Sequence, residues 1–188
     1  MNWQAIIRRY KDKHYRNHER ETAWFAGQPT LKAAIEYAAT ATRNGDGKRF
    51  DHQRRAPKVA LQQAKRKLLN NETKIAACRT FQELIDLIGG AVYSIYGLGE
   101  LYIYDTALRI GSKLGIEPDR VYLHCGTRSG ARRLGYSVNR LYIEMRELPD
   151  ALKALSAAEV EDILCIFKDH RGNAQPEHPA NTNKTFCR

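Results

Sequence analysis

The stretch of sequence that organises this chain is Ile95-Tyr96-Gly97-Leu98-Gly99-Glu100-Leu101-Tyr102-Ile103-Tyr104-Asp105-Thr106-Ala107-Leu108-Arg109-Ile110-Gly111. It joins a Gly-Leu-Gly turn to a segment in which apolar residues recur at i, i+4, i+7 and i+11, namely Ile103, Ala107, Ile110 and Leu114. That spacing places the four side chains on one face of an α-helix. Gly115 is a suitable C-terminal stop, and Pro118 follows three residues later. The stretch therefore predicts a glycine turn followed by a helix of the protein core.

Helical patterns also occupy the sequence on both sides of this stretch. Upstream, apolar spacing and breaker residues predict helices over residues 2–20, 30–42 and 57–69, and a short one ending near residue 78. Thr80 and Glu83 have the spacing of a capping box, which predicts a helix that leads to the turn. Downstream, we expect helices over 117–124 and 127–134, a strand or a helix over 141–145, and a helix from the capping box at Ser156 to about residue 168. The predicted fold class is mainly α.

The expected architecture is a single helical domain, residues 1–170, which contains a helix-hairpin-helix-like element. It has a basic part, 1–79, and a core part with the Gly-Leu-Gly turn, 80–170. Residues 171–188 are rich in Asn, Pro and Thr and are expected to form a flexible tail. No apolar run approaches the ~18 residues that a membrane span needs, and the N-terminal residues lack the apolar region of a secretory signal. We therefore expect a cytoplasmic protein without membrane association.

Positive charge is concentrated in the first part of the chain. The net charge is +10; residues 1–79 carry 18 Lys and Arg against 7 Asp and Glu, whereas residues 80–188 carry 13 against 14. Such an asymmetry favours a polyanionic partner. The alternative explanation is a solvated helical surface that keeps the protein soluble.

Three groups of basic residues are candidates for phosphate contacts. Arg8 and Arg9 lie in the N-terminal helix, where interleaved aromatic residues would suit exposed bases. The second group lies between residues 43 and 67, a segment with nine basic and two acidic residues. Its candidates are Lys48, Arg49, Arg54, Arg55, Lys65 and Arg66. The third group follows the central stretch and consists of Arg128, Arg132 and Arg133.

A helix, a Gly-hydrophobic-Gly turn and a second helix resemble the helix-hairpin-helix motif of DNA-binding proteins. The matching residues are Ile95, Gly97, Leu98, Gly99, Ile103, Ala107 and Ile110. The resemblance implies that Gly97 and Gly99 approach the DNA backbone, where amides at a helix N-terminus bind a phosphate without reading its base. Glycine permits this approach because a side chain would hold the backbone away from the phosphate.

A second resemblance overlaps the first and competes with it. Asp105, Thr106, Arg109, Leu114 and Gly115 are similar to a segment of the helix-hairpin-helix DNA glycosylase superfamily. That resemblance implies a catalytic Asp105, which would stabilise positive charge developing at the sugar or help activate the nucleophile. The alternative for Asp105 is a pair with Arg109 at i+4, worth about 0.2–0.5 kcal/mol on an exposed helix surface.

Other reactive side chains give weaker signals. His124 and Cys125 are adjacent, but neighbouring residues of a helix point in different directions, so we expect a helix-end histidine and a partly buried thiol rather than a nucleophile pair. The spacings of Cys165, His170, His178 and Cys187 match no compact zinc site. We therefore expect no metal and no cofactor.

The sequence thus predicts a protein that binds nucleic acid, DNA in preference to RNA, through basic helices and the glycine turn. One alternative is a glycosylase- or lyase-like enzyme that uses Asp105, which would imply a role in DNA repair. Another is a basic interaction protein that binds an acidic protein partner. The oligomeric state stays open.

Overall fold

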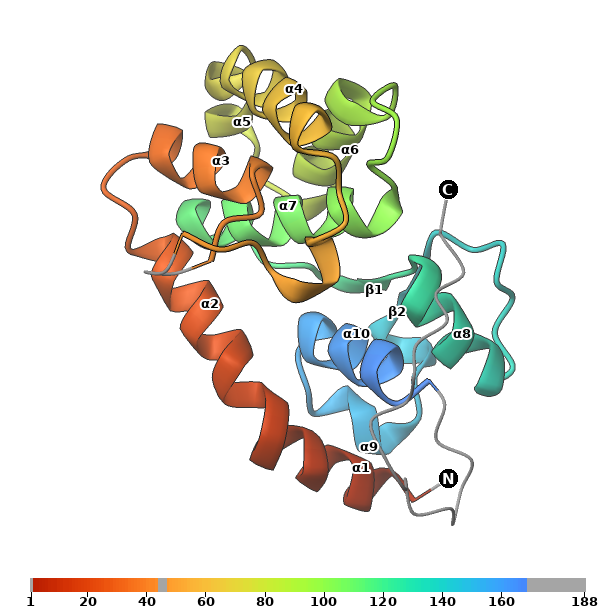
Figure 1. The fold of residues 1–188 in the computed structure, drawn as a ribbon. Coiled ribbons are helices and arrows are strands. Elements are labelled where there is room, and N and C mark those ends of the chain that lie inside the picture. Colours follow the sequence, from red (N-terminus) through yellow and green to blue (C-terminus); the bar gives the residue numbers. More distant parts are fainter. Residues whose placement is uncertain (1, 44–46, 169–188) are drawn as a thin grey trace. The chain divides into compact units, whose positions relative to one another are not determined.

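The computed structural model describes residues 2–43 and 47–168, and this part of the chain is mainly α-helical, as predicted (Figure 1). It divides into two compact units. Residues 17–118 form the central unit, and residues 2–16 together with 119–168 form the terminal unit. The first sixteen residues thus group with the C-terminal segments, a division that the sequence patterns did not indicate. The predicted tail, residues 171–188, lies outside the described residues.

The N-terminal residues form a longer helical run than the sequence predicted. α1 (Trp3–Tyr10), a π-helix (Lys11–Tyr15) and α2 (Arg16–Ala26) follow one another without a break, whereas the prediction ended near residue 20. The run begins at Asn2, whose side-chain oxygen accepts a hydrogen bond from the backbone N–H of Ala5 at 3.1 Å. This is an N-cap interaction, which satisfies a backbone donor that the helix itself leaves unpaired.

The central unit continues from α2 through further helices, two of which begin at a predicted cap. Its further helices are α3 (Leu31–Ala39), a 3₁₀ helix (Asp51–Gln53), α4 (Lys58–Leu69), α5 (Glu72–Ala77), α6 (Phe81–Val92) and α7 (Glu100–Leu114). Thr30 and Thr80 cap α3 and α6 as predicted, and the capping box of Thr80 with Glu83 is complete. Gly115 ends α7 with φ +68°, a conformation that favours glycine.

α7 is the core helix of the central unit. It packs against α3 and α6, and Ala107 and Ile110 of its predicted apolar face are fully buried. Gly89 of α6 faces Ile103 of α7, since a Cβ there would be in ordinary van der Waals contact with that side chain at 3.8 Å. The Tyr102 hydroxyl donates a hydrogen bond to the Ala39 carbonyl of α3 at 2.7 Å. The turn between α6 and α7 is therefore attached to the most buried helix of the unit.

In the terminal unit, two predicted boundaries were wrong. Residues 120–122 form strand β1 (Arg120–Tyr122) and not the end of a helix over 117–124. α8 (Cys125–Arg133) begins after His124, so Thr127 lies in its first turn instead of capping it. The open alternative for residues 141–145 is a strand, β2 (Tyr142–Glu144), which pairs antiparallel with β1 and places Val121 opposite Ile143. Both residues of this pair are fully buried, as suits β-branched side chains in a strand.

α10 organises the rest of the terminal unit. After β2 come a 3₁₀ helix (Met145–Glu147), α9 (Asp150–Lys153) and α10 (Ala157–Ile166), which begins at the predicted capping box of Ser156. α8 lies very close to α10, because a Cβ on Gly130 would be 2.3 Å from the Leu164 carbonyl oxygen. α1 also packs on α10, and the Tyr10 hydroxyl donates to the Asp162 carboxylate at 2.9 Å. Among the helices within residues 2–43 and 47–168, none has the length and apolarity to cross a membrane.

Candidate nucleic-acid interface

The glycine turn, residues 93–99, connects α6 to α7 and is anchored by its apolar residues. Ile95 and Leu98 are buried, whereas Gly97 is exposed and Gly99, the N-cap residue of α7, is half-buried. Gly97 has φ +89°, which L-amino acids with a side chain rarely adopt. The backbone at Gly97 is therefore accessible, which is what contact with a phosphate requires.

The glycine turn runs alongside α4. A Cβ built on Gly97 would lie 3.0 Å from Cδ of Pro57, the residue before α4. Near the other end of this helix, Nζ of Lys67 donates a hydrogen bond to Oγ of Ser94 in the turn at 3.1 Å. Because both ends of α4 contact the turn, the turn and this helix border the same surface of the central unit.

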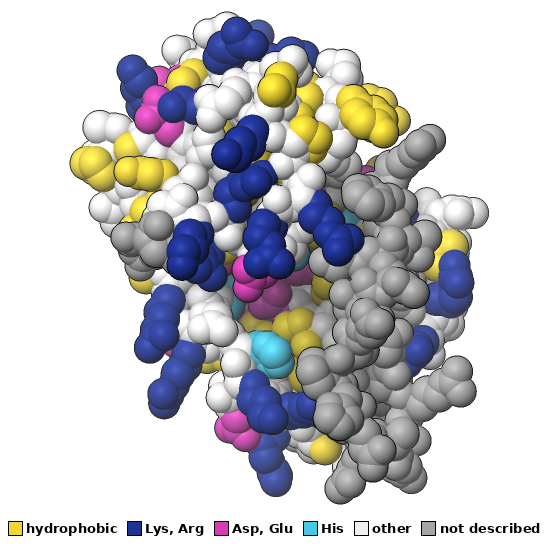
Figure 2. Space-filling view, viewed as in Figure 1, with side chains coloured by type: hydrophobic (Ala, Val, Ile, Leu, Met, Phe, Trp, Pro, Cys, Tyr) yellow, Lys and Arg dark blue, Asp and Glu magenta, His cyan; other side chains and the backbone are white. Residues whose placement is uncertain are grey.

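Exposed Lys and Arg side chains surround this contact. α4 buries one apolar face and exposes Lys58, Arg66 and Lys67. The chain leading into α4 carries two further exposed arginines. We name this set the basic surface, which consists of Arg54, Arg55, Lys58, Arg66 and Lys67. Figure 2 shows Lys and Arg side chains gathered over the region where Figure 1 draws α4 and the chain that leads to it.

The other predicted phosphate contacts of the central unit are placed differently. Nη1 of Arg49 donates to the Ala56 carbonyl at 2.6 Å and so braces the loop before α4. Nζ of Lys65 lies 3.1 Å from the Glu36 carboxylate of α3. Lys48 is exposed. Arg49 and Lys65 thus contribute to the fold, although their sequence context predicted the same role as that of Arg54 and Arg66.

The remaining predicted contacts belong to the terminal unit and are not part of the basic surface. Arg8, Arg132 and Arg133 are exposed. The guanidinium of Arg9 lies 5.8 Å from the centre of the Phe167 ring. Arg128 is half-buried, and its Nη1 donates to backbone carbonyls of the segment after α8, those of Val138 and, at 2.6 Å, Arg140. Arg128 therefore holds that segment in place.

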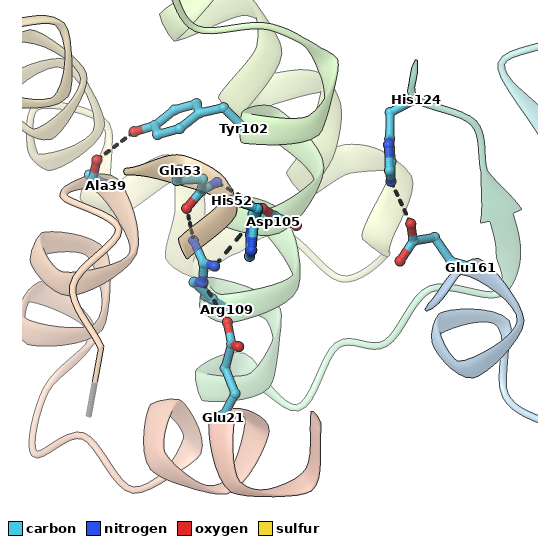
Figure 3. A network of polar contacts seen from close by, with 9 residues as sticks. All are labelled: Glu21, Ala39, His52, Gln53, Tyr102, Asp105, Arg109, His124 and Glu161. Atoms are coloured by element: carbon cyan, nitrogen blue, oxygen red, sulfur yellow. Dashed lines mark hydrogen bonds and ion pairs between the residues drawn. The ribbon is translucent and has the colours of Figure 1, made fainter. Parts of the chain in front are cut away.

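Asp105 is the acceptor at the centre of a polar network in the central unit (Figure 3). Its Oδ2 accepts a hydrogen bond from Nε2 of Gln53 at 2.7 Å and lies 2.8 Å from Nε2 of His52. Nη2 of Arg109, one helical turn further along α7, is 3.9 Å from the same oxygen. The Asp105 side chain is 14% exposed. The carboxylate thus faces the loop before α4 rather than open solvent.

Arg109 is buried and is bound on several sides. Its Nη1 donates to Oε1 of Gln53 and its Nε to Oε1 of Glu21 in α2, both at 2.7 Å. The guanidinium also lies 3.9 Å from the centre of the Phe50 ring, a distance that fits a cation–π contact. The Asp105–Arg109 proximity predicted from the i+4 spacing exists, but it belongs to a buried network and not to an exposed helix surface.

The network fixes the loop that carries Arg54 and Arg55. Gln53 donates its amide to Asp105 and accepts through its carbonyl from Arg109, so one side chain bonds to both of these α7 residues. The sequence did not single out Gln53, His52 or Glu21, because these contacts join residues 52 to 88 positions apart. Periodicity reports only neighbours on the same element.

The pair of His52 and Asp105 is expected to make stability depend on pH. Partial burial disfavours the charged imidazole, but the charge of Asp105 and the hydrogen bond to it outweigh burial and raise the pKa of His52. A pKa that is higher in the folded state adds stability below the unfolded value of ~6.5, and this stability is lost as pH rises through the folded value. We therefore expect wild type to be more stable than His52→Gln. The difference between their free energies of unfolding should be larger at about pH 5 than at about pH 8. Urea denaturation at the two pH values measures this difference, and an excess that stayed constant or grew with pH would contradict the raised pKa.

A separate buried pair joins α8 to α10 in the terminal unit (Figure 3). Nε2 of His124 lies 2.5 Å from Oε1 of Glu161, and both side chains are buried. The backbone N–H of His124 donates to Oγ1 of Thr127 at 2.7 Å, so this histidine stands at a helix end, as expected. Its partner Glu161 lies 37 positions away and had no signal in the sequence.

In the described ranges, no group of three or more His, Cys, Asp or Glu side chains is arranged to hold a metal ion. His170, His178 and Cys187, which were considered with Cys165 as zinc ligands, lie outside these ranges. No family model matches the chain, and no curated protein or solved structure matches it significantly. Its function must therefore be inferred from its own residues and their geometry.

Proposed function

We propose that this protein binds nucleic acid, DNA in preference to RNA, through the basic surface and the glycine turn of the central unit. The cations would neutralise phosphates of the nucleic acid, and the backbone at Gly97 would approach the same nucleic-acid strand. Such contacts position a protein on the nucleic acid without reading its sequence. The preference for DNA follows from the resemblance of the turn to the helix-hairpin-helix motif.

The observation that carries this proposal is the contact between the turn and α4. A turn that binds phosphate needs an exposed backbone, and it needs cations that reach the same or neighbouring phosphates. The approach of Gly97 to Pro57 and the hydrogen bond from Lys67 to Ser94 place both features on one surface. Two acids offset part of this charge. Glu100 is exposed at the start of α7, and Oδ1 of Asp51 lies 3.9 Å from Nη1 of Arg54. The five cations of the basic surface outnumber them.

Binding is favoured over catalysis by Asp105 because of the surroundings of its carboxylate. A catalytic carboxylate must come within hydrogen-bond reach of the reacting group. Oδ2 of Asp105 instead accepts from Gln53 and pairs with His52, and the side chain is mostly buried. Asp105 is better explained as the residue that positions the loop with Arg54 and Arg55.

Binding of duplex DNA across a series of salt concentrations tests the proposal. Wild type should bind with an affinity that falls with salt, with a log–log slope of roughly −0.9 for each phosphate contact. Arg54→Gln and Arg66→Gln should each weaken binding and reduce the magnitude of the slope by about one. Arg20→Gln, an exposed arginine of α2, is the matched control and should change neither. Fluorescence anisotropy of a labelled duplex measures both quantities.

Two results would count against this function. If wild type bound neither DNA nor RNA at low salt, nucleic acid would be excluded, and an acidic protein captured from nuclease-treated lysate would become the better partner. If Arg54→Gln, Arg66→Gln and Arg20→Gln had equal effects, the basic surface would not be the site of contact.

A further inference from the structure

The glycine turn presents two tyrosines that phosphate contacts do not use. Tyr93 is 82% exposed and Tyr96 is 83% exposed. Residues 92–98 bury every third side chain, those of Val92, Ile95 and Leu98, so the two tyrosines occupy equivalent outward positions in the pattern. We infer that Tyr93 and Tyr96 stack on unpaired bases, and that the nucleic acid bound here contains single-stranded nucleotides. This inference rests on the function proposed above and specifies its ligand.

The turn is held firmly enough to serve as a platform. The backbone N–H of Tyr93 donates to Gly89 at 2.8 Å, that of Ile95 to Val92 at 2.8 Å, and that of Leu98 to Ile95 at 3.2 Å. Ile95 and Leu98 anchor it in the core. A tyrosine side chain has two rotatable torsions, so fixing it against a base costs little conformational entropy.

The residues that follow the two tyrosines contact α4 or the residue before it. Ser94, next to Tyr93, accepts the hydrogen bond from Lys67. Gly97, next to Tyr96, lies against Pro57, which precedes Lys58. Figure 2 shows exposed hydrophobic side chains beside Lys and Arg over this part of the molecule. Aromatic rings bordered by cations are the arrangement that binds single strands, because cations follow the phosphates while the bases stack on the rings.

The chemistry of the surface favours this ligand over a duplex or an apolar protein. The bases of a duplex are stacked on each other, so along its length it offers no free π-face to an exposed ring. An apolar partner would require a contiguous apolar patch, whereas Ser94 and Gly97 follow the two tyrosines in the chain and the adjoining α4 exposes Lys58 and Lys67. Unpaired nucleotides offer base faces that stack on the rings and phosphates that pair with the lysines.

The test compares a labelled thymidine oligonucleotide with a duplex of the same length, using the full chain. Because each substitution removes one ring on which a base stacks, Tyr93→Ala and Tyr96→Ala should each weaken single-strand binding by roughly 5- to 150-fold. Their affinity for the duplex and their salt slope should match wild type. Tyr93→Phe and Tyr96→Phe are the matched controls and should bind like wild type, because phenylalanine keeps the ring face.

Three outcomes separate the inference from the proposal beneath it. Wild-type single-strand affinity in the alanine variants would overturn stacking. An equal loss of affinity for single strand and duplex would also overturn it, because the tyrosines would then support contacts that both ligands share. In both cases duplex binding by wild type would still support the function proposed above. Failure of wild type to bind either probe would overturn both. Thermal melting followed by circular dichroism checks folding, and both side chains are exposed, so each variant should melt like wild type.

Discussion

Replacement of Arg109 by methionine is expected to lower the free energy of unfolding by about 2–3 kcal/mol. The Arg109 side chain is 2% exposed. Its loss would leave the carboxylate of Glu21 without its cation and the carbonyl of Gln53 without its donor. The Gln53 carbonyl is buried, so losing its donor costs about 1–3 kcal/mol. The Glu21 side chain is 32% exposed, so its carboxylate would lose its cation but keep some contact with water. Methionine keeps much of the apolar volume, so the loss would report the polar partners rather than a cavity.

Arg66→Met is the matched control for this variant. Arg66 is exposed on α4, and surface replacements of this kind usually change stability by less than about 0.5 kcal/mol. Urea denaturation followed by circular dichroism gives both values. A loss below about 1 kcal/mol for Arg109→Met would mean that the network behaves like a surface ion pair.

In the terminal unit, Glu161→Leu is expected to lower the free energy of unfolding by about 3 kcal/mol. Leucine offers no acceptor to the imidazole of His124, which is 1% exposed and cannot turn to water without opening the contact between α8 and α10. Glu161→Gln keeps an oxygen acceptor and should lose less, about 1 kcal/mol. The order of the two losses distinguishes the hydrogen bond from the volume of the side chain.

The comparison for the Glu161 variants is Asp12→Asn, which removes an exposed carboxylate from the same unit. Denaturant unfolding should place Asp12→Asn within about 0.5 kcal/mol of wild type. Equal stability of Glu161→Leu and Asp12→Asn would show that His124 does not depend on its buried acid.

The elements that the sequence predicted correctly are those with a local cause. Thr30, Thr80 and Ser156 each cap a helix because a side-chain oxygen three residues before a backbone N–H is a short-range arrangement. β1 was predicted as helix because three residues are too few to show the alternation of apolar and polar side chains that is typical of a strand. It is a strand because Ile143, 22 positions later, pairs with Val121. Strand pairing is non-local, so a short strand has little signature of its own.

The same distinction applies to the candidate site. Arg49 and Arg54 lie in one charged loop, and the sequence predicted a phosphate contact for both. In the structure Arg49 donates to the Ala56 carbonyl, whereas Arg54 is exposed on the surface. Asp105 was a candidate because of the residues around it in α7. Its partners Gln53 and His52 come from another segment, and they turn its carboxylate toward the loop.

Local sequence patterns were enough to predict the mainly helical class, the core helix α7 with its glycine turn, and the excess of positive charge before residue 80. These features depend on periodicity, on capping and on the backbone freedom of glycine, which act within one or two helical turns. Only the tertiary structure decided that the turn borders α4, which cations stay exposed there, and that Asp105 and Arg109 are buried together. Each of these depends on contacts between segments far apart in the chain, and such contacts leave no local pattern.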